Sequence, residues 1–188
     1  MSGELREYLE SKKSGIYKEW LERFWRSFGK ESEKFFKREV DRFQNPFGYR
    51  VEETFQGLID VIFGDFDWEK ANYFLDRLVQ LRAIQETEPS KALHLFFLLK
   101  EIIREDFGED FIEKFGIFEY LRLEDKIDIL LLKAMDYFLS YRERLYQIRY
   151  DEWKRNRFLL LKKAGIIYDP VEGSPIPVER EKIAGGKN

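Results

Sequence analysis

The placement of proline constrains the fold of this chain of 188 residues more than any other feature. The five prolines leave residues 1–44, 47–88 and 90–169 without any. Proline disrupts the interior of a helix, so each of these stretches is free to form long helices. Apolar residues recur there at intervals of three and four, and no segment shows the sustained alternation that is typical of strands. The sequence therefore predicts an all-α protein, built as a single helical bundle.

Six helices are expected from the apolar spacing and from the residues at their ends. They cover residues 4–28, 31–43, 51–63, 67–85, 90–107 and 118–157 or beyond. Asp67 suits the N-cap of the fourth helix, and Pro89 suits the first turn of the fifth. Residues 45–48, with the sequence NPFG, are typical of a turn. Gly108 and Gly116 are expected to bracket a short segment before the last helix.

The end of the chain predicts a long last helix followed by a tail. Gly165 is expected to end the helix, and the residues from Tyr168 onward hold three prolines and three glycines with little apolar content. Such a segment cannot build a core of its own and is expected to be extended. The expected division is a helical domain over residues 1–164 and an extended tail over residues 165–188.

The composition allows a large aromatic core and excludes several kinds of site. Hydrophobic residues make up 44% of the chain, with 18 Phe, and there is no cysteine. Disulfides, zinc–thiolate centres, iron–sulfur clusters and cysteine nucleophiles are therefore excluded. The net charge of -3 gives no general attraction to nucleic acid. No apolar run is long enough to span a membrane and no secretory signal is present, so a cytoplasmic protein is expected.

No motif marks a catalytic, cofactor-binding or metal-binding site. The chain has no glycine-rich phosphate loop, Walker motif or nucleophile elbow, and no pair of carboxylates stands out as acid and base. Residues 65–76 carry acids in the alternation of a calcium loop. Lys70 stands where that loop needs glycine and Asp76 where it needs glutamate, so a helix start is favoured instead. The sequence predicts a protein that is not an enzyme and carries no cofactor.

His94 is the only histidine and raises the one hypothesis of a ligand site. On a helix over residues 92–107 it falls with Glu101 and Glu105 on the face opposite the apolar residues. No glutamate stands three positions before it, so the Glu-x-x-His signature of di-iron bundles is absent. The pattern favours a surface histidine, with a haem or metal ligand as the alternative.

Other polar residues leave further alternatives open. Arg82, Gln85 and Lys100 interrupt the apolar pattern, and they either tie helix ends and loops together, which we favour, or line a small polar cavity. Residues 142–163 carry eight Lys or Arg against three Asp or Glu, interleaved with aromatic residues. This segment is either a contact surface for an acidic partner, a membrane surface or RNA, or a solvated helix face. The overall charge balance still argues against a nucleic-acid partner.

The last helix carries two apolar seams. The first follows spacings of four and three and is predicted to pair with a second copy of the chain, as in a coiled coil. Its residues are Leu123, Ile127, Leu130, Ala134, Tyr137, Tyr141, Leu145 and Ile148. The second seam is available for the core of the domain and contains Leu131, Met135, Phe138 and Leu139. One helix would then serve both as the dimer element and as the output of the domain.

Several linked motifs resemble the RsbRD N-terminal domain family, which comprises sensory domains of stressosome co-antagonist proteins. An R-F-x-N-P-x-G element is matched by Arg42, Phe43, Asn45, Pro46 and Gly48, an R-A-x-Q element by Arg82, Ala83 and Gln85, and a P-S-x-A segment by Pro89, Ser90 and Ala92, with Leu99 and Lys100 in the helix that follows. The resemblance covers roughly residues 4–150.

The resemblance implies a haem-free, globin-like domain that dimerises and passes signals along its C-terminal helix to a STAS domain or a kinase. The phosphorylation sites of a STAS domain have no counterpart in this sequence. Our first hypothesis is a non-enzymatic sensory or regulatory module that binds a protein partner. One alternative is an accessory subunit or assembly factor of an anaerobic membrane-bound redox complex, because similar stand-alone domains occur near genes for such complexes. A second alternative is a haem or small-ligand sensor that uses His94.

Overall fold

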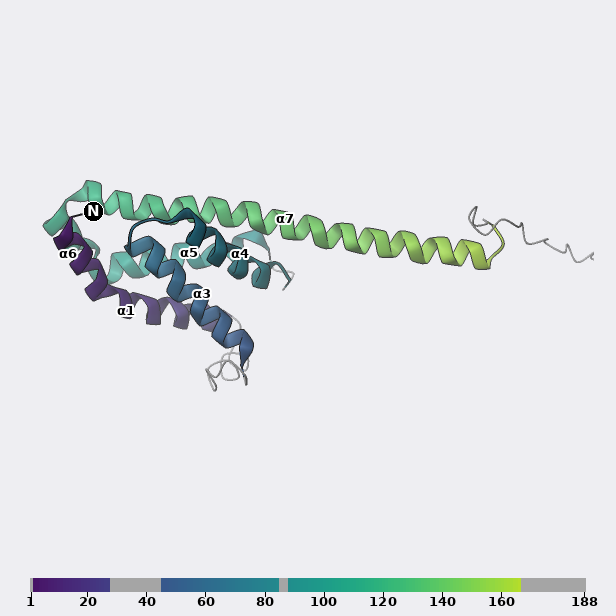
Figure 1. Cartoon of the computed structure of the whole chain (residues 1–188), viewed down its shortest axis with the longest axis horizontal. Helices are drawn as coiled ribbons and strands as arrows, with labels where there is room; N and C mark the ends of the chain where they lie inside the picture. Colours follow the sequence, from purple (N-terminus) through teal and green to yellow (C-terminus); the bar gives the residue numbers. More distant parts are fainter. Residues whose placement is uncertain (1, 28–44, 85–87, 167–188) are drawn as a thin grey trace, which may run out of the picture. The chain divides into compact units, whose positions relative to one another are not determined.

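The structure is a computed structural model that describes residues 2–27, 45–84 and 88–166 (Figure 1). Its helices are α1 (Gly3–Arg26), α3 (Pro46–Phe63), α4 (Trp68–Ile84), α5 (Pro89–Ile103), the π-helical turn η1 (Arg104–Gly108), α6 (Glu109–Phe115) and α7 (Ile117–Lys163). No strand occurs among these residues, so the prediction of an all-α fold with a long last helix is confirmed. The helix expected over residues 31–43 and the predicted tail after residue 166 lie outside the described residues.

The chain divides into two compact units, Met1–Arg142 and Glu143–Asn188. The first unit contains α1 to α6 and the N-terminal part of α7. The described part of the second unit is the remainder of α7 with the three residues that follow it. The domain boundary expected between residues 164 and 165 stays a prediction.

Aromatic rings from α1 and α3 form the centre of the core in the first unit. The ring centroid of Phe55 lies 4.3 Å from that of Trp20 and 4.7 Å from that of Phe24. Trp20 is fully buried, and its indole Nε1 donates a hydrogen bond of 2.7 Å to the backbone oxygen of Leu95 on α5. A buried indole N–H needs such a partner. This one side chain therefore fixes α1 against both α3 and α5.

The helix α3 starts earlier than the sequence predicts. Asn45 is its N-cap, with Oδ1 accepting a hydrogen bond of 2.8 Å from the backbone N–H of Gly48, and Pro46 is its first residue. A β-carbon on Gly48 would lie 2.3 Å from the Asn45 side chain, so the cap requires glycine there. The prediction of a turn over residues 45–48 is wrong because asparagine and proline favour helix starts as well as turns.

The segment after α5 also differs from the prediction. Instead of ending at residue 107, the helix passes into the π-helical turn η1 and continues as α6. Gly108 is a buried residue at the end of that turn, so it does not bracket a separate segment. Gly116 does separate α6 from α7, and its φ of 84° lies in a region that favours glycine.

The two helix ends that the sequence predicts from Asp67 and Gly165 are confirmed. The Asp67 carboxylate accepts hydrogen bonds from the backbone N–H groups of Glu69 and Lys70 at the start of α4, at 2.9 and 3.3 Å. Gly165 has a φ of 68° just after the end of α7. The N–H of Gly165 bonds to the oxygen of Lys162, and the next N–H bonds to the oxygen five residues before it, both at 3.0 Å. This is the Schellman arrangement that commonly closes helices.

Candidate functional site

The N-terminal part of α7 packs into the core of the first unit. Its buried residues recur at spacings of three and four and are Tyr120, Leu123, Ile127, Leu130, Ala134 and Phe138. Four residues of the predicted dimer seam are therefore buried in their own domain: Leu123, Ile127, Leu130 and Ala134. Tyr137 and Tyr141 are partly buried against the same core. Up to this point the first seam therefore faces the core of its own domain. The sequence had predicted that it would pair with a second copy of the chain.

The remaining seam residues have different environments. Leu139, expected in the core, is 49% exposed, whereas Phe138 beside it is fully buried. Leu145 is partly exposed and Ile148 is 49% exposed, and both belong to the second unit. A contact between two copies through Leu145 and Ile148 stays a prediction. In the second seam, Leu131 and Met135 also pack against the core. The sequence misplaced the inner part of the first seam because an apolar helix with two stripes does not reveal which stripe the rest of the chain covers.

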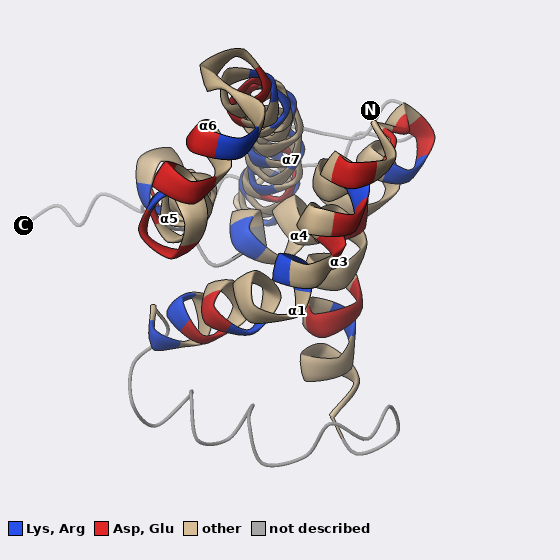
Figure 2. Cartoon of the chain, turned by 90° about the vertical axis from the view of Figure 1, so that its left-hand side faces the viewer, with Lys and Arg blue, Asp and Glu red and all other residues tan. Residues whose placement is uncertain are grey.

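A cluster of ion pairs joins α5 to the inner part of α7. Acidic and basic residues are interleaved on the helices, and most of their ion pairs are exposed (Figure 2). The pairs around Lys100 are less exposed. Its Nζ lies 3.0 and 3.1 Å from the two carboxylate oxygens of Asp128 and 3.7 Å from Oε2 of Glu124. The side chains of Lys100 and Glu124 are only 16% and 17% exposed, so solvent screens their interaction less than at a free surface.

The π-helical turn is attached to the same cluster, which we call the α5–α7 ion cluster. Arg104, the first residue of η1, places Nη2 3.1 Å from Oε1 of Glu124. The hydroxyl of Tyr120 donates to the same oxygen at 3.3 Å. The hydrogen bond to Glu124 raises the pKa of Arg104, and burial raises the pKa of Tyr120. At neutral pH both groups therefore keep their protons, and α5, η1 and α7 are held by one carboxylate.

Two further contacts tie α7 to the other helices. Lys126 donates from Nζ to the backbone oxygens of Ile62 and Gly64, both at 2.9 Å, and so satisfies carbonyl groups at the C-terminal end of α3. Burial lowers the pKa of Lys126. The hydroxyl of Tyr141 donates to Oδ1 of Asp76 on α4 at 2.7 Å. Helices α3, α4 and α5 thus each hold α7 through a polar side chain.

The family-motif residues of the sequence have mainly structural positions. Arg82 is 6% exposed, and its guanidinium donates to the backbone oxygens of Lys91 and Ala92 at 3.2 and 3.3 Å. It also lies 5.3 Å from the ring centroid of Phe24, and burial lowers its pKa. Arg82 therefore connects α4 with the first turn of α5 and with α1. This geometry is the helix-tying role that the sequence favours.

The other motif positions divide between helix starts and undescribed residues. Pro89 opens α5, and Ser90 is exposed in its first turn. Arg42 and Gln85 lie outside the described residues. Among the described motif residues, Lys100 pairs with Asp128 on α7, while Asn45, Pro46 and Gly48 form the start of α3.

His94 lies where the helical pattern places it, on the exposed side of α5. Its ring stacks beside that of Phe97, with the centroids 6.4 Å apart, and Phe97 is itself 50% exposed. Within the described part of the chain, no group of three or more potential metal ligands occurs. An exposed ring on a polar face offers no enclosed pocket for haem, so the arrangement does not favour the sensor alternative that uses His94.

Sequence reasoning missed most of the side chains that hold α7. Arg104, Glu124, Lys126 and Asp128 are charged residues on amphipathic helices, where such residues normally face water. The only signal was Lys100, because it interrupts an apolar run. Its partners could not be found from spacing, since they lie on a different helix.

Residues 14–152 match the family of the RsbT co-antagonist protein rsbRD N-terminal domain. The chain belongs to this family. No curated protein and no solved structure gave a match. The family consists of regulatory domains of the stressosome type and is not an enzyme family.

The matched range places the site within this regulatory domain. It includes the α5–α7 ion cluster, Lys126 and Tyr141, and it ends inside α7. Leu5 and Leu9 of α1, and its N-cap Ser2, precede the matched range. Among the described helices, none is both long and apolar enough to cross a membrane.

Proposed function

We propose that this domain is a non-enzymatic sensory module that regulates a protein partner through α7. The observation that carries the proposal is the change in the surroundings of this one unbroken helix. Between Tyr120 and Phe138 one side of the helix is buried in the core. In the same part, Glu124 and Asp128 bond to η1 and α5, and Lys126 bonds to the end of α3. Beyond Arg142 no described residue of the helix is buried, and most of its apolar side chains are exposed. A continuous helix can pass a displacement of its anchored part on to a surface further along the chain.

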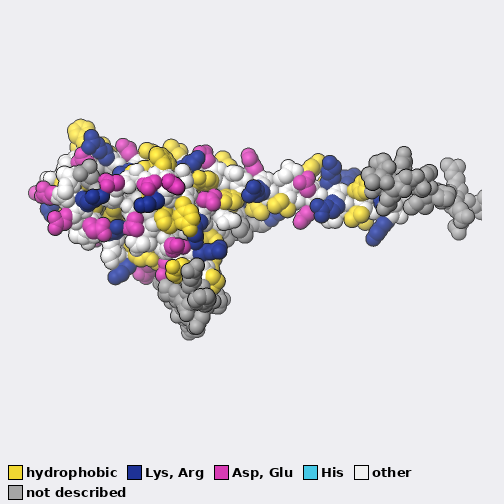
Figure 3. Space-filling view, viewed as in Figure 1, with side chains coloured by type: hydrophobic (Ala, Val, Ile, Leu, Met, Phe, Trp, Pro, Cys, Tyr) yellow, Lys and Arg dark blue, Asp and Glu magenta, His cyan; other side chains and the backbone are white. Residues whose placement is uncertain are grey.

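The exposed part of α7 carries an aromatic stripe suited to a protein contact. Its residues are Tyr146, Tyr150, Trp153 and Leu160, each more than half exposed. The rings of Tyr150 and Trp153 stack with centroids 6.2 Å apart, and the Arg157 guanidinium lies 5.1 Å from the Trp153 ring centroid. Aromatic and arginine side chains are enriched at the centres of protein interfaces. Hydrophobic and basic side chains lie next to each other along this segment (Figure 3).

A second stripe on another side of the same segment suits pairing with a second copy. It contains Leu145, Ile148 and Leu159, of which Ile148 and Leu159 are 49% and 48% exposed. A helix that is apolar on more than one side is normally covered on each of them. We propose that this stripe forms the dimer contact, and that the aromatic stripe and the nearby basic residues bind an acidic surface of the partner.

Charge substitutions in each stripe test the two assignments separately. Ile148→Glu/Leu159→Glu should turn a dimer into a monomer in light scattering and leave the helix content in circular dichroism unchanged. Tyr150→Glu/Trp153→Glu should stay dimeric but lose the protein that co-purifies with the wild type from the native cells. Gln147→Lys, on the side of the helix away from both stripes, is the matched control. A wild-type protein that remains monomeric at high concentration refutes the dimer, and a partner retained by the Tyr150/Trp153 variant refutes the aromatic contact.

A further inference from the structure

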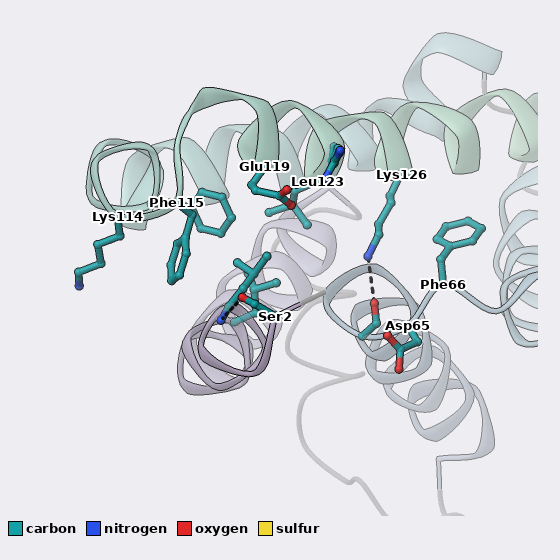
Figure 4. Close-up of a pocket in the computed structure, with 13 residues that line it drawn as sticks. Ser2, Asp65, Phe66, Lys114, Phe115, Glu119, Leu123 and Lys126 are labelled. Carbon is teal, nitrogen blue, oxygen red and sulfur yellow. Dashed lines mark hydrogen bonds and ion pairs between the residues drawn. The ribbon is translucent and has the colours of Figure 1, made fainter.

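A cavity of about 680 Å³ lies in the first unit between the start of α1, the turn after α3, α6 and the start of α7 (Figure 4). Its volume is within the range of about 300–1,000 Å³ that is usual for small-molecule sites. Part of its wall comes from Leu5 and Leu9, which precede the residues that match the family. The cavity is therefore formed partly by residues outside that match, and it is separate from the contacts of α5 and of the exposed part of α7.

The floor of the cavity is apolar and aromatic. Leu5, Leu9, Phe111 and Leu123 line it and are each at most 5% exposed. Phe115, partly buried against the core, stands on one side of the opening (Figure 4). Phe rings favour edge-to-face contacts with another ring, so this lining suits a ligand with an aromatic body.

The charges at the opening are compensated with one exception. Asp65 forms an ion pair with Arg6, which lies outside the cavity, and Glu119 forms one with Arg122. Lys114 lies 3.1 Å from a carboxylate oxygen of Asp110, which also lies outside the cavity. These pairs leave no free carboxylate among the described lining residues that would exclude an anion.

The exception is Lys126, which reaches from α7 towards the end of α3, beside Asp65 (Figure 4). Its two hydrogen bonds go to neutral backbone oxygens, and no described carboxylate comes within ion-pair distance of it. An ammonium group has three donors, so one N–H is left over. Burial makes this cation costly to keep charged and lowers the pKa of Lys126, and the charge of nearby Asp65 offsets only part of that effect.

We propose that this cavity binds a small carboxylate with an aromatic body, its anion on the Lys126 ammonium and its ring on the phenylalanines of the lining. The carboxylate pairs with the N–H of Lys126 that the protein leaves free, and the ring packs on the apolar floor. Lys126 also holds the end of α3, so an occupant would act on a contact between α3 and α7. The inference adds an input to the proposed function but does not rest on it, because binding is measured without any partner.

The test is titration calorimetry of the full chain with 3-phenylpropionate, 3-phenylpropionamide and propionate. We expect 3-phenylpropionate to bind with a dissociation constant of about 1 mM or less, as its size allows, and the other two to bind at least about tenfold more weakly. Methyl NMR signals of Leu5, Leu9 and Leu123 should shift during the titration. Equal binding of the amide overturns the role of Lys126, and no binding of 3-phenylpropionate at about 10 mM overturns the site.

Two variants with a matched control locate the binding. Lys126→Gln removes the charge but keeps a donor for the end of α3, and it should weaken binding at least about tenfold. Leu5→Phe adds bulk to the apolar floor where the ring would lie, without changing the charge, and should weaken binding, which keeps the test decisive if Lys126→Gln fails to fold. Lys91→Gln removes an exposed lysine elsewhere and should bind as the wild type does. Unchanged binding by Leu5→Phe overturns the proposal, because the ligand then lies elsewhere.

Discussion

Replacing Lys100 by methionine tests whether the α5–α7 ion cluster holds α7 on the domain. Methionine keeps most of the apolar stem and removes the charge. The same helix offers a matched control, because Lys91 forms an ion pair with Glu88 at 3.1 Å, nearly the 3.0 Å that separates Lys100 from Asp128. The two pairs therefore agree in distance. They differ in exposure, since the lysine side chain is 70% exposed at position 91 and 16% exposed at position 100.

The expected loss of stability follows from this difference in exposure. A solvent-exposed pair contributes about 0–1 kcal/mol, whereas removing one partner of a buried pair costs about 3–5 kcal/mol. Lys100 lies between these limits, because Glu124 retains Arg104 and Tyr120 as partners when the lysine is lost. We therefore expect Lys100→Met to lower the free energy of unfolding by about 2 kcal/mol. Lys91→Met should lower it by less than about 0.5 kcal/mol.

Urea unfolding followed by circular dichroism measures both values. The effect of Lys100→Met should also change little between low and high salt, since partly buried charges are poorly screened. A double-mutant cycle with Glu124→Gln should show a coupling of about 1 kcal/mol or more. Equal losses for Lys100→Met and Lys91→Met would refute the reasoning, because exposure would then not decide the strength of these pairs.

Three other substitutions probe the fold. Asn45→Ala removes the cap of α3 and should lower the free energy of unfolding by about 1 kcal/mol in urea titration, and an unchanged value would contradict the capping role. Gly116→Ala places a side chain at a φ of 84° and a ψ of 160°, and should cost about 1–3 kcal/mol, whereas a neutral effect would mean that the joint between α6 and α7 relaxes easily. Burial, and to a lesser degree the charge of Glu52, raise the pKa of Tyr17 from 10.0 to about 12. The folded state therefore holds this proton more tightly than the unfolded state, and the resulting stabilisation is complete below pH 10 and is lost as the pH rises through 12. Unfolding measured across this range should show the loss in the wild type and a smaller one in Tyr17→Phe, and identical curves would contradict the shift.

The sequence predicted the helical class and several helix ends for identifiable physical reasons. Apolar spacing reports which face a helix buries, and it correctly placed His94 on the exposed side of α5. Gly165 and Asp67 act within a few residues of their own position, so their roles as helix ends could be predicted locally. The start of α3 could not be resolved in this way, because Asn45 and Pro46 suit two local structures.

The contacts that hold α7 depend on residues that are far apart in the chain. Lys126 bonds to backbone oxygens more than sixty positions away, and a backbone oxygen leaves no mark on the sequence. The same limit applies to the seam on α7. Leu130 and Ile148 have similar apolar character, but only the arrangement of the other helices buries the first and leaves the second exposed.

The π-helical turn η1 sets the phase of α6 relative to α5. Leu99, Ile103, Phe107 and Phe111 follow one another at intervals of four, and each is at most 2% exposed. Four residues of an α-helix turn by about 400°, so such a row drifts by about 40° at each step. A π turn bonds each residue to the fifth one along and takes more residues per revolution, so it reverses part of this drift. Deleting one residue of the turn, such as the exposed Glu105, would restore α-helical phase and rotate Phe111 by about 100° away from the row. Compared with a continuous α-helix, the turn therefore holds one additional residue. That residue sets the direction in which the chain leaves α6, and hence the point at which α7 begins.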